Sequence, residues 1–332
     1  MSMGEKVDFS LMRRSESSLD DLGGARWDLF ISAYNSSERV RTVFDCAAAD
    51  EKHWLVHREY GFLDSDLPTN APVFAPEADG EAGFWLEYFA ASGLPENCSG
   101  LRICVDSTGF MRPHLLVMLK LLWLRGVALL SVLYSDPLSY ESGETTVLSK
   151  GPVTVVRQVQ GFEGAHVADA GESDLLVIGT GYDEALIRRV AEDRMAARKL
   201  QMFGLPSLQP HMYQENQLQV YKASESLGKL PERSGLYAPA NNPFITAAVL
   251  NDAVVSEIAS RGVSNLYLSP LGTKPQVLGF GLYYMTLLQG EPASIVFPFA
   301  EQYTQESSLG LARVWRYEVE LDWGSAGAAG RV

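Results

Sequence analysis

Hydrophobic and polar positions follow two periods along the chain, and together they predict alternating strands and helices. In the first half, short apolar runs typical of buried strands lie at 27–34, 52–57, 101–106 and 127–134. Helical spacing is found at 38–48, 84–92 and 112–125, and a further strand is expected at 153–159. Such an alternation of strands and helices is typical of a parallel α/β sheet.

The second half of the chain repeats this pattern. Strands are expected at 174–178, 265–270, 293–299 and 313–321, and helices at 184–199, at 217–227 and from Phe244 and Thr273 onward. We therefore predict an α/β protein of two Rossmann-like halves with mainly parallel sheets, the arrangement that a pseudo-dimer would have. The predicted parts are a disordered tail at 1–24, a first half at 25–160, a second half at 161–322 and a disordered tail at 323–332.

The composition is ordinary for a soluble globular protein, with 46% apolar and 20% charged residues among 332. A formal net charge of −14 argues against direct binding of duplex DNA, which needs clustered Lys and Arg. The start of the sequence is polar, so no signal peptide is expected, and the longest apolar segment, 114–124, is too short to span a bilayer. These features predict a cytoplasmic protein that does not bind a membrane.

The stretch at 265–276 predicts a buried strand, a sharp turn at Gly272 and a helix that opens at Thr273. The start of a helix directs unpaired backbone N–H groups and the positive end of the helix dipole toward one point. With Ser269 at the strand end and Lys274 in the first helical turn, the pattern is typical of a pocket for a phosphate or a carboxylate. The alternative is an ordinary turn whose Lys274 points into water.

A second polar turn follows the predicted strand at 101–106. It contains Asp106, Ser107, Thr108 and Arg112, whose side chains could bind a ribose or a phosphate. The alternative is that Asp106 or Ser107 caps the next helix and that Arg112 is a surface residue.

A third polar turn contains Gly179, Thr180 and Asp183 and follows the predicted strand at 174–178. The dinucleotide-binding fingerprint requires a further glycine in the next helical turn, and this sequence has Glu184 and Ala185 there. We therefore expect neither a Rossmann NAD site nor another cofactor, but a tight turn with Asp183 near the helix start.

These turns share one position, because each follows a predicted strand, and parallel sheets bind ligands beyond the carboxyl ends of their strands. The sequence therefore predicts a ligand cleft formed by the polar turns at 35–38, 106–109, 134–136, 179–183 and 269–274.

No motif with a familiar catalytic or metal-binding spacing points to a reaction, so the catalytic residues are unknown and the question of enzymatic activity stays open. His53 and His57 are four residues apart, but in a predicted strand, and no metal site is expected. If the protein is an enzyme acting on a nucleotide or a sugar phosphate, Asp106 or Asp183 is the candidate acid–base group. A third hypothesis is a non-catalytic subunit that contacts its partner through the aromatic residues at 84–89.

The motif at 266–274, in which Gly272, Thr273 and Lys274 join a strand to a helix, resembles that of CARF-type Rossmann domains. The segment at 105–110 lies in a comparable place in the first half, whereas Leu271 departs from the family's usual second glycine. CARF domains and the related SAVED sensors bind cyclic oligonucleotides in prokaryotic antiviral defence. The resemblance implies a sensor of a phosphorylated, nucleotide-type ligand that signals to a protein partner.

Overall fold

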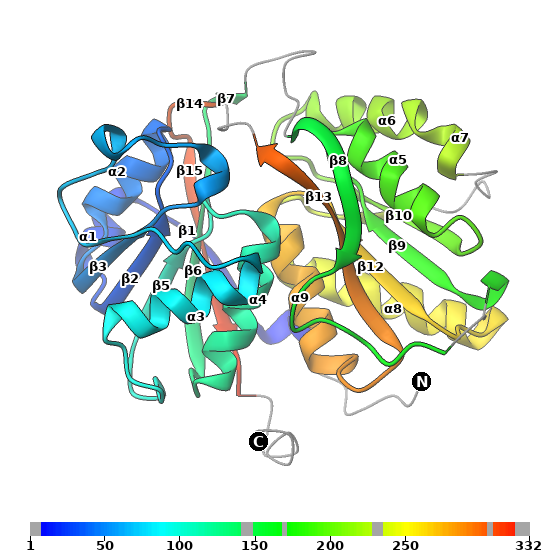
Figure 1. Ribbon diagram of the computed structural model, residues 1–332, viewed down its shortest axis with the longest axis horizontal. Coiled ribbons are helices and arrows are strands. Elements are labelled where there is room, and N and C mark those ends of the chain that lie inside the picture. The colour runs from blue at the N-terminus through cyan, green and yellow to red at the C-terminus, as the bar shows by residue number, and fades with distance from the viewer. Residues whose placement is uncertain (1–7, 141–148, 168–170, 228–234, 304–307, 323–332) are drawn as a thin grey trace. The chain divides into compact units, whose positions relative to one another are not determined.

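The chain forms two compact units in the computed structural model, which describes residues 8–140, 149–167, 171–227, 235–303 and 308–322 (Figure 1). The seven-stranded unit contains Met12–Leu148 and Gln302–Val332, and the six-stranded unit contains Met1–Leu11 and Ser149–Glu301. Each unit has its own α/β sheet, so the predicted fold class, two Rossmann-like halves, is confirmed.

The seven-stranded sheet has the order β1-β15-β6-β5-β2-β3-β4. Its strands are β1 (Arg13–Ser17), β2 (Trp27–Ala33), β3 (Ala49–Leu55), β4 (Val73–Phe74), β5 (Ile103–Asp106), β6 (Leu129–Asp136) and β15 (Arg313–Glu320). The strands from β6 to β4 are parallel to their neighbours, whereas β15 is antiparallel to both β1 and β6. A separate antiparallel pair joins β7 (Ser139–Tyr140) to β14 (Ser308–Leu309).

Different helices cover the two faces of this sheet (Figure 1). They are α1 (Leu19–Gly24), α2 (Glu38–Cys46), α3 (Gly80–Ser92) and α4 (Arg112–Leu124). Helices α1 and α2 pack on the face that carries Phe30 and Trp54, and the ring of Phe44 stacks on Trp54 with the centroids 3.6 Å apart. Helix α3 packs on the opposite face, where the Tyr88 hydroxyl lies 2.8 Å from His53 Nδ1.

The aromatic residues of α3 belong to the core of the seven-stranded unit. Phe84, Trp85, Tyr88 and Phe89 are each at most 4% exposed. The Trp85 indole Nε1 donates a hydrogen bond to the His114 carbonyl of α4 at 2.9 Å. The hypothesis that this cluster is a surface for a protein partner is therefore wrong, because its rings are buried in the interior of the unit.

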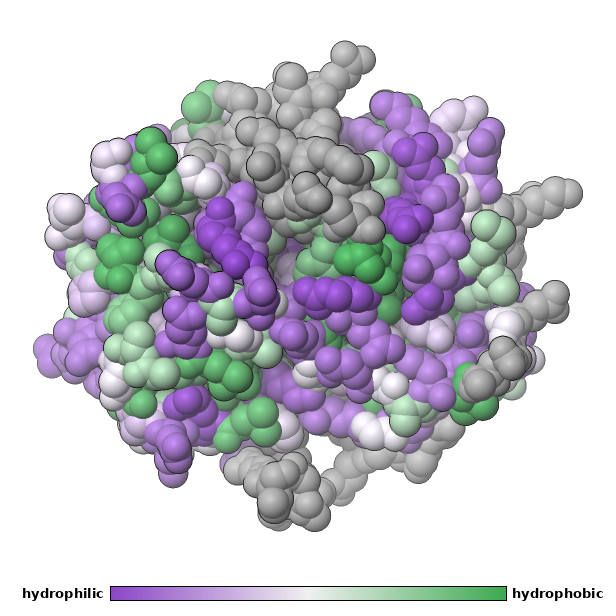
Figure 2. All heavy atoms as spheres, in the orientation of Figure 1, coloured by the Kyte–Doolittle hydropathy of each residue, from purple (hydrophilic) through white to green (hydrophobic). Residues whose placement is uncertain are grey.

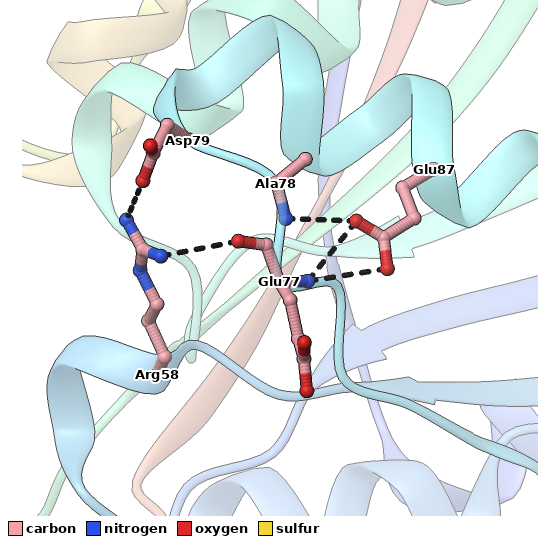
Figure 3. A network of polar contacts seen from close by, with 5 residues as sticks. All are labelled: Arg58, Glu77, Ala78, Asp79 and Glu87. Carbon is pink, nitrogen blue, oxygen red and sulfur yellow. Dashed lines mark hydrogen bonds and ion pairs between the residues drawn. The ribbon is translucent and has the colours of Figure 1, made fainter.

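A polar network fixes the loop that leads into α3 (Figure 3). The Glu87 carboxylate accepts hydrogen bonds from the backbone N–H groups of Glu77 and Ala78, the latter at 2.8 Å. Arg58 donates to the Glu77 carbonyl at 3.1 Å and to Asp79 Oδ1 at 2.6 Å. These groups are exposed, so their contribution to the stability of the unit is small.

The six-stranded sheet has the order β11-β10-β9-β12-β13-β8. Its strands are β8 (Ser149–Gln158), β9 (Leu175–Gly179), β10 (Arg198–Gly204), β11 (Gly235–Ala238), β12 (Leu266–Pro270) and β13 (Ala293–Tyr303). The five strands from β11 to β13 are parallel to their neighbours.

Helices also cover both faces of the six-stranded sheet (Figure 1). They are α5 (Glu184–Asp193), α6 (Met212–Lys222) and α7 (Ser224–Leu227) on one face, and α8 (Pro243–Arg261) and α9 (Lys274–Leu287) on the other. Helices α8 and α9 approach closely at Gly279, where an added Cβ would lie 2.4 Å from the Pro243 carbonyl oxygen and 2.6 Å from Thr246 Cβ.

The structure differs from the predicted boundaries in its long-range pairings. The last strand, at 313–320, joins the first sheet rather than the second, and the strand at 149–158 joins the second rather than the first. The helix predicted at 184–199 ends at Asp193, and the unpredicted strand β10 begins at Arg198. Residues 13–24, predicted as part of a disordered tail, contain β1 and α1. The tail predicted at 323–332 lies outside the described residues.

Polar residues form much of the face that Figure 2 displays. Figure 2 shows that hydrophilic side chains occupy much of the displayed face and that hydrophobic ones occur among them in small groups. Among the described residues, no helix combines the length and the apolar character that crossing a bilayer requires.

The close contact of α8 and α9 gives a first prediction. Gly279→Ala should lower the free energy of unfolding by about 1–3 kcal/mol, because the added methyl group overpacks the contact with Pro243 and Thr246. Urea denaturation measures the change, with Ser256→Ala on the exposed side of α8 as the control. An unchanged or raised free energy of unfolding for Gly279→Ala would show that the helices can separate at no cost.

The buried His53 gives a second prediction. Burial lowers the pKa of His53, against a smaller opposing effect of Glu51. Below about pH 6.5 the unfolded chain takes up a proton at this residue that the folded protein resists, so the free energy of unfolding should fall as the pH drops toward the lowered pKa. Above that range His53 is neutral in both the folded and the unfolded chain, so its protonation no longer lowers the free energy of unfolding.

Urea denaturation at about pH 7.5 and about pH 5.5 tests this for the wild type and His53→Gln, because this window contains the ordinary pKa of histidine. The variant should lose less stability than the wild type between the two pH values. Equal losses would contradict the assignment of His53 as a histidine held neutral by the fold. The remaining histidines are common to both proteins and cancel in the comparison.

Candidate ligand site at the strand ends

The strand order reverses once in each sheet, and this defines two topological switch points. From β2 the chain continues to β3 and β4 on one side, and then returns to form β5 on the other side of β2. From β9 it continues to β10 and β11, and then returns to form β12 on the other side of β9. In open α/β sheets ligands bind at such a point, beyond the carboxyl ends of the strands.

At both switch points a glycine in one turn lies against a backbone carbonyl of the neighbouring strand end. A Cβ added at Gly109, after β5, would lie 2.0 Å from the carbonyl oxygen of Ala33 at the end of β2. A Cβ added at Gly181, after β9, would lie 2.2 Å from the carbonyl oxygen of Leu271 after β12. Any side chain at either glycine would force the two turns apart.

Several backbone donors of the turn between β12 and α9 are satisfied within the turn itself. The Thr273 N–H donates to Gln276 Oε1 at 3.3 Å, and the Gln276 N–H donates to Thr273 Oγ1 at 3.4 Å, which forms a capping box. The Val277 N–H donates to the Thr273 carbonyl, and Pro275 has no N–H. The expectation of several unpaired backbone donors at this turn is therefore wrong.

One side chain of this turn has a buried donor without a partner in the described residues. Gln276 is 1% exposed, and its Nε2 has no hydrogen-bond partner among the described residues. Lys274, the first residue of α9, is half-buried. A Cβ added at Gly272 would lie 2.4 Å from Gln276 Oε1, so the glycine leaves room for the amide in its present position.

The Thr273 hydroxyl and Gln276 connect this turn to the ends of two other strands. Thr273 Oγ1 donates to the carbonyl of Ala240, which follows β11. A Cβ at Gly204, the last residue of β10, would lie 3.6 Å from Gln276 Oε1. The first turn of α9 therefore lies over the ends of β10 and β11. Ser269 lies within β12, is fully buried and has an Oγ without a partner in the described part of the chain.

The turn after β9 has a structural role. The Thr180 hydroxyl lies 2.8 Å from the Met202 carbonyl oxygen and 2.9 Å from Asn216 Oδ1. A Cβ at Gly179 would meet the ring of Phe280 at 3.0 Å. Asp183 is the N-cap of α5 and accepts hydrogen bonds from the N–H groups of the next helical turn. All three predicted residues of this turn are thus accounted for by packing and capping.

The turn after β5 also uses most of its polar groups internally. Asp106 is fully buried and accepts hydrogen bonds from Ser32 Oγ at 3.2 Å and from the Thr108 N–H at 3.0 Å. The Ser107 hydroxyl donates to the Leu133 carbonyl at 2.7 Å. These residues join the ends of β2, β5 and β6, so Asp106 has a demonstrated role in positioning the strand ends.

Sequence reasoning missed a buried arginine beside this turn. Arg39, in the first turn of α2, is 1% exposed and donates a hydrogen bond to the Ser135 carbonyl. The Ser135 N–H donates to Thr108 Oγ1 at 3.0 Å, while the hydroxyls of Ser135 and Ser37 are buried without a partner among the described residues. An arginine in an amphipathic helix is normally at the surface, so the sequence contains no signal for its burial. Arg112, the remaining predicted residue, begins α4 and is half-buried.

Asp136, at the end of β6, is a second missed residue, although its turn was among the predicted polar turns. Its Oδ2 accepts a hydrogen bond from Trp315 Nε1 at 2.7 Å, and its Oδ1 has no partner in the described structure. Burial raises the pKa of Asp136, against smaller opposing effects of the Trp315 hydrogen bond and the charges of Arg313 and Arg39. Within the described residues, no group of three or more His, Cys, Asp or Glu side chains is placed to hold a metal ion.

Comparison of the chain with protein-family models, with curated proteins and with solved structures finds no match. The resemblance to CARF and SAVED domains therefore stays a prediction.

The contacts of Asp183 give a prediction that distinguishes a helix-capping role of its carboxylate from a role in ligand binding or acid–base catalysis. Asp183→Ala should lower the free energy of unfolding by about 1 kcal/mol, whereas Asp183→Asn should leave it nearly unchanged, because asparagine caps helices as well as aspartate does. Urea denaturation of both variants measures this. Equal destabilisation by the two substitutions would indicate a role for the charge beyond capping.

Proposed function

We propose that this protein binds a phosphorylated, nucleotide-type ligand at the switch point between β9 and β12, with a phosphate at the first turn of α9. The observation that carries the proposal is the buried amide of Gln276, whose Nε2 has no hydrogen-bond partner among the described residues. A buried donor without an acceptor costs about 1–3 kcal/mol. A ligand oxygen at this position would remove that cost.

A further feature of the turn favours an anion as the ligand. Lys274 contributes a positive charge in the first turn of α9, where the helix dipole is also positive. The donors of the proposed site are therefore side chains rather than the row of backbone N–H groups that the sequence predicted.

The proposed role is that of a sensor. Asp183 and Asp106, the two acid–base candidates, are engaged in capping and in joining strand ends, and this favours binding without turnover. The resemblance to CARF and SAVED domains supports a cyclic oligonucleotide as the ligand, prokaryotic antiviral signalling as the context and a protein as the partner.

A second candidate function is an enzyme that acts on a nucleotide or a sugar phosphate. Asp136 favours it, because this carboxyl group has one oxygen without a partner in the described residues and a pKa raised by burial. Such a group can donate a proton at a higher pH than an ordinary aspartate.

A thermal-shift screen of nucleotides, cyclic oligonucleotides and sugar phosphates tests the proposed function with Lys274→Ala. A ligand at 100 times its dissociation constant stabilises the folded protein by about 2.7 kcal/mol and raises the midpoint. The variant should lose this shift, because a main attraction for the phosphate is gone, while its own midpoint should stay close to that of the wild type.

Lys222→Ala is the matched control, since it removes the same charge from an exposed position in the last turn of α6. This control should keep the full ligand-induced shift. A ligand shift that survives in Lys274→Ala would refute the proposed phosphate position. Mass spectrometry of the same samples would detect product, whose appearance would favour the enzyme.

A further inference from the structure

Three aromatic rings gather at the carboxyl ends of β10 and β11 in the six-stranded unit. Phe203 and Tyr237 are the second-to-last residues of these strands, and their rings stack with centroids 5.8 Å apart and planes inclined by 25°. Tyr213, in the first turn of α6, has its ring centroid 6.3 Å from that of Phe203 and 6.5 Å from that of Tyr237. We name Phe203, Tyr213 and Tyr237 the aromatic platform.

The aromatic platform is both held in place and accessible. Phe203 is only 5% exposed and fixes the platform to the sheet, whereas Tyr237 is 47% exposed. The Tyr213 hydroxyl accepts a hydrogen bond from Gln217 Nε2 at 2.9 Å, which orients its ring from the next turn of α6. A ring with this degree of exposure and fixed neighbours can stack on a planar ligand at little cost in conformational entropy.

The aromatic platform shares its two strand ends with the proposed phosphate position. Gly204, next to Phe203, lies close to the amide of Gln276. Ala240, three residues after Tyr237, accepts the hydrogen bond of the Thr273 hydroxyl. The chain beyond these strands stays paired, because the Leu205 N–H donates to the Ala238 carbonyl at 2.8 Å. The strand ends that carry the rings and the first turn of α9 therefore lie at the same carboxyl edge of the six-stranded sheet, with the rings on the α6 face and Gln276 on the α9 face.

We infer that the aromatic platform stacks against the base of the nucleotide whose phosphate is bound at the first turn of α9. This inference rests on the proposed function and narrows the ligand to phosphates that carry a planar base, as against sugar phosphates. Stacking on an aromatic side chain is tolerant of sequence because every base has a π-face. The platform therefore selects for the presence of a base and leaves the choice of base to other contacts.

The test compares three probes by isothermal titration: a nucleoside, the corresponding nucleoside monophosphate and ribose phosphate. The wild type should bind the monophosphate more tightly than ribose phosphate. Tyr237→Leu should weaken the affinity for the monophosphate about tenfold, because one stacking contact is lost. The affinity for ribose phosphate should stay unchanged. Tyr237→Phe keeps the ring and should retain the affinity.

Tyr221→Leu is the matched control, because this tyrosine of α6 is 76% exposed and lies outside the aromatic platform. It should change the affinity for none of the probes. If the wild type binds ribose phosphate as tightly as the monophosphate, the aromatic platform does not stack against a base. The proposed phosphate position would then be unaffected.

Binding of the nucleoside shows which of the two claims fails, the stacking role of the aromatic platform or the phosphate position at α9. Nucleoside binding that Tyr237→Leu weakens and Lys274→Ala does not would uphold the platform and remove the phosphate position. Binding of the monophosphate that is insensitive to Tyr237→Leu would overturn the platform. No binding of any of the three probes would overturn both.

Discussion

The contact that both units depend on is the approach of a turn glycine to a neighbouring backbone carbonyl at the switch point. Gly109 closes on Ala33 and Gly181 on Leu271, and in each case an added Cβ would come within 2.2 Å of the carbonyl oxygen. A switch point normally leaves a crevice, because the two strands send their connections in opposite directions. Here the missing side chain lets the two turns touch, so polar groups from both strands gather in a small space.

The groups that remain for a ligand beside these turns depend on how the helix starts are capped. Three helices that start at the edge of the six-stranded sheet are capped by side chains, α5 by Asp183, α8 by Asn242 and α9 by Thr273 with Gln276, whereas α6 has no side-chain cap. Capping removes the backbone donors that make a helix start an anion site. Among the described residues of this turn, the Gln276 amide has an Oε1 that serves the cap and an Nε2 that has no partner, as the Ser269 Oγ also has none. The proposed site is in this sense a consequence of the capping box.

The class of fold could be predicted from the sequence because the periods of strands and helices are local. The prediction failed where the apolar pattern is interrupted or where residues far apart in the chain pair. The predicted helix at 184–199 overlaps only the first two residues of β10, and the strand itself was not predicted because Lys199 and Gln201 interrupt its apolar positions. The pairing of β15 with β6 joins residues far apart in the chain, which no local pattern encodes. At the candidate sites, the polar turns were predicted, but whether each side chain was already engaged, as Asp183 is, depends on tertiary contacts.

The net charge of −14 constrains how an anion can be bound at all. A chain of this charge repels a phosphate at long range, although salt weakens that repulsion beyond about 10 Å. Affinity must then come from short-range contacts, and the six-stranded unit offers two kinds that do not need a positive surface. The Gln276 amide is a neutral donor in a buried position, and Tyr237 is a ring that stacks without charge. With Lys274 as the charged group between strand and helix, such contacts would favour a ligand that carries a base over a bare phosphate.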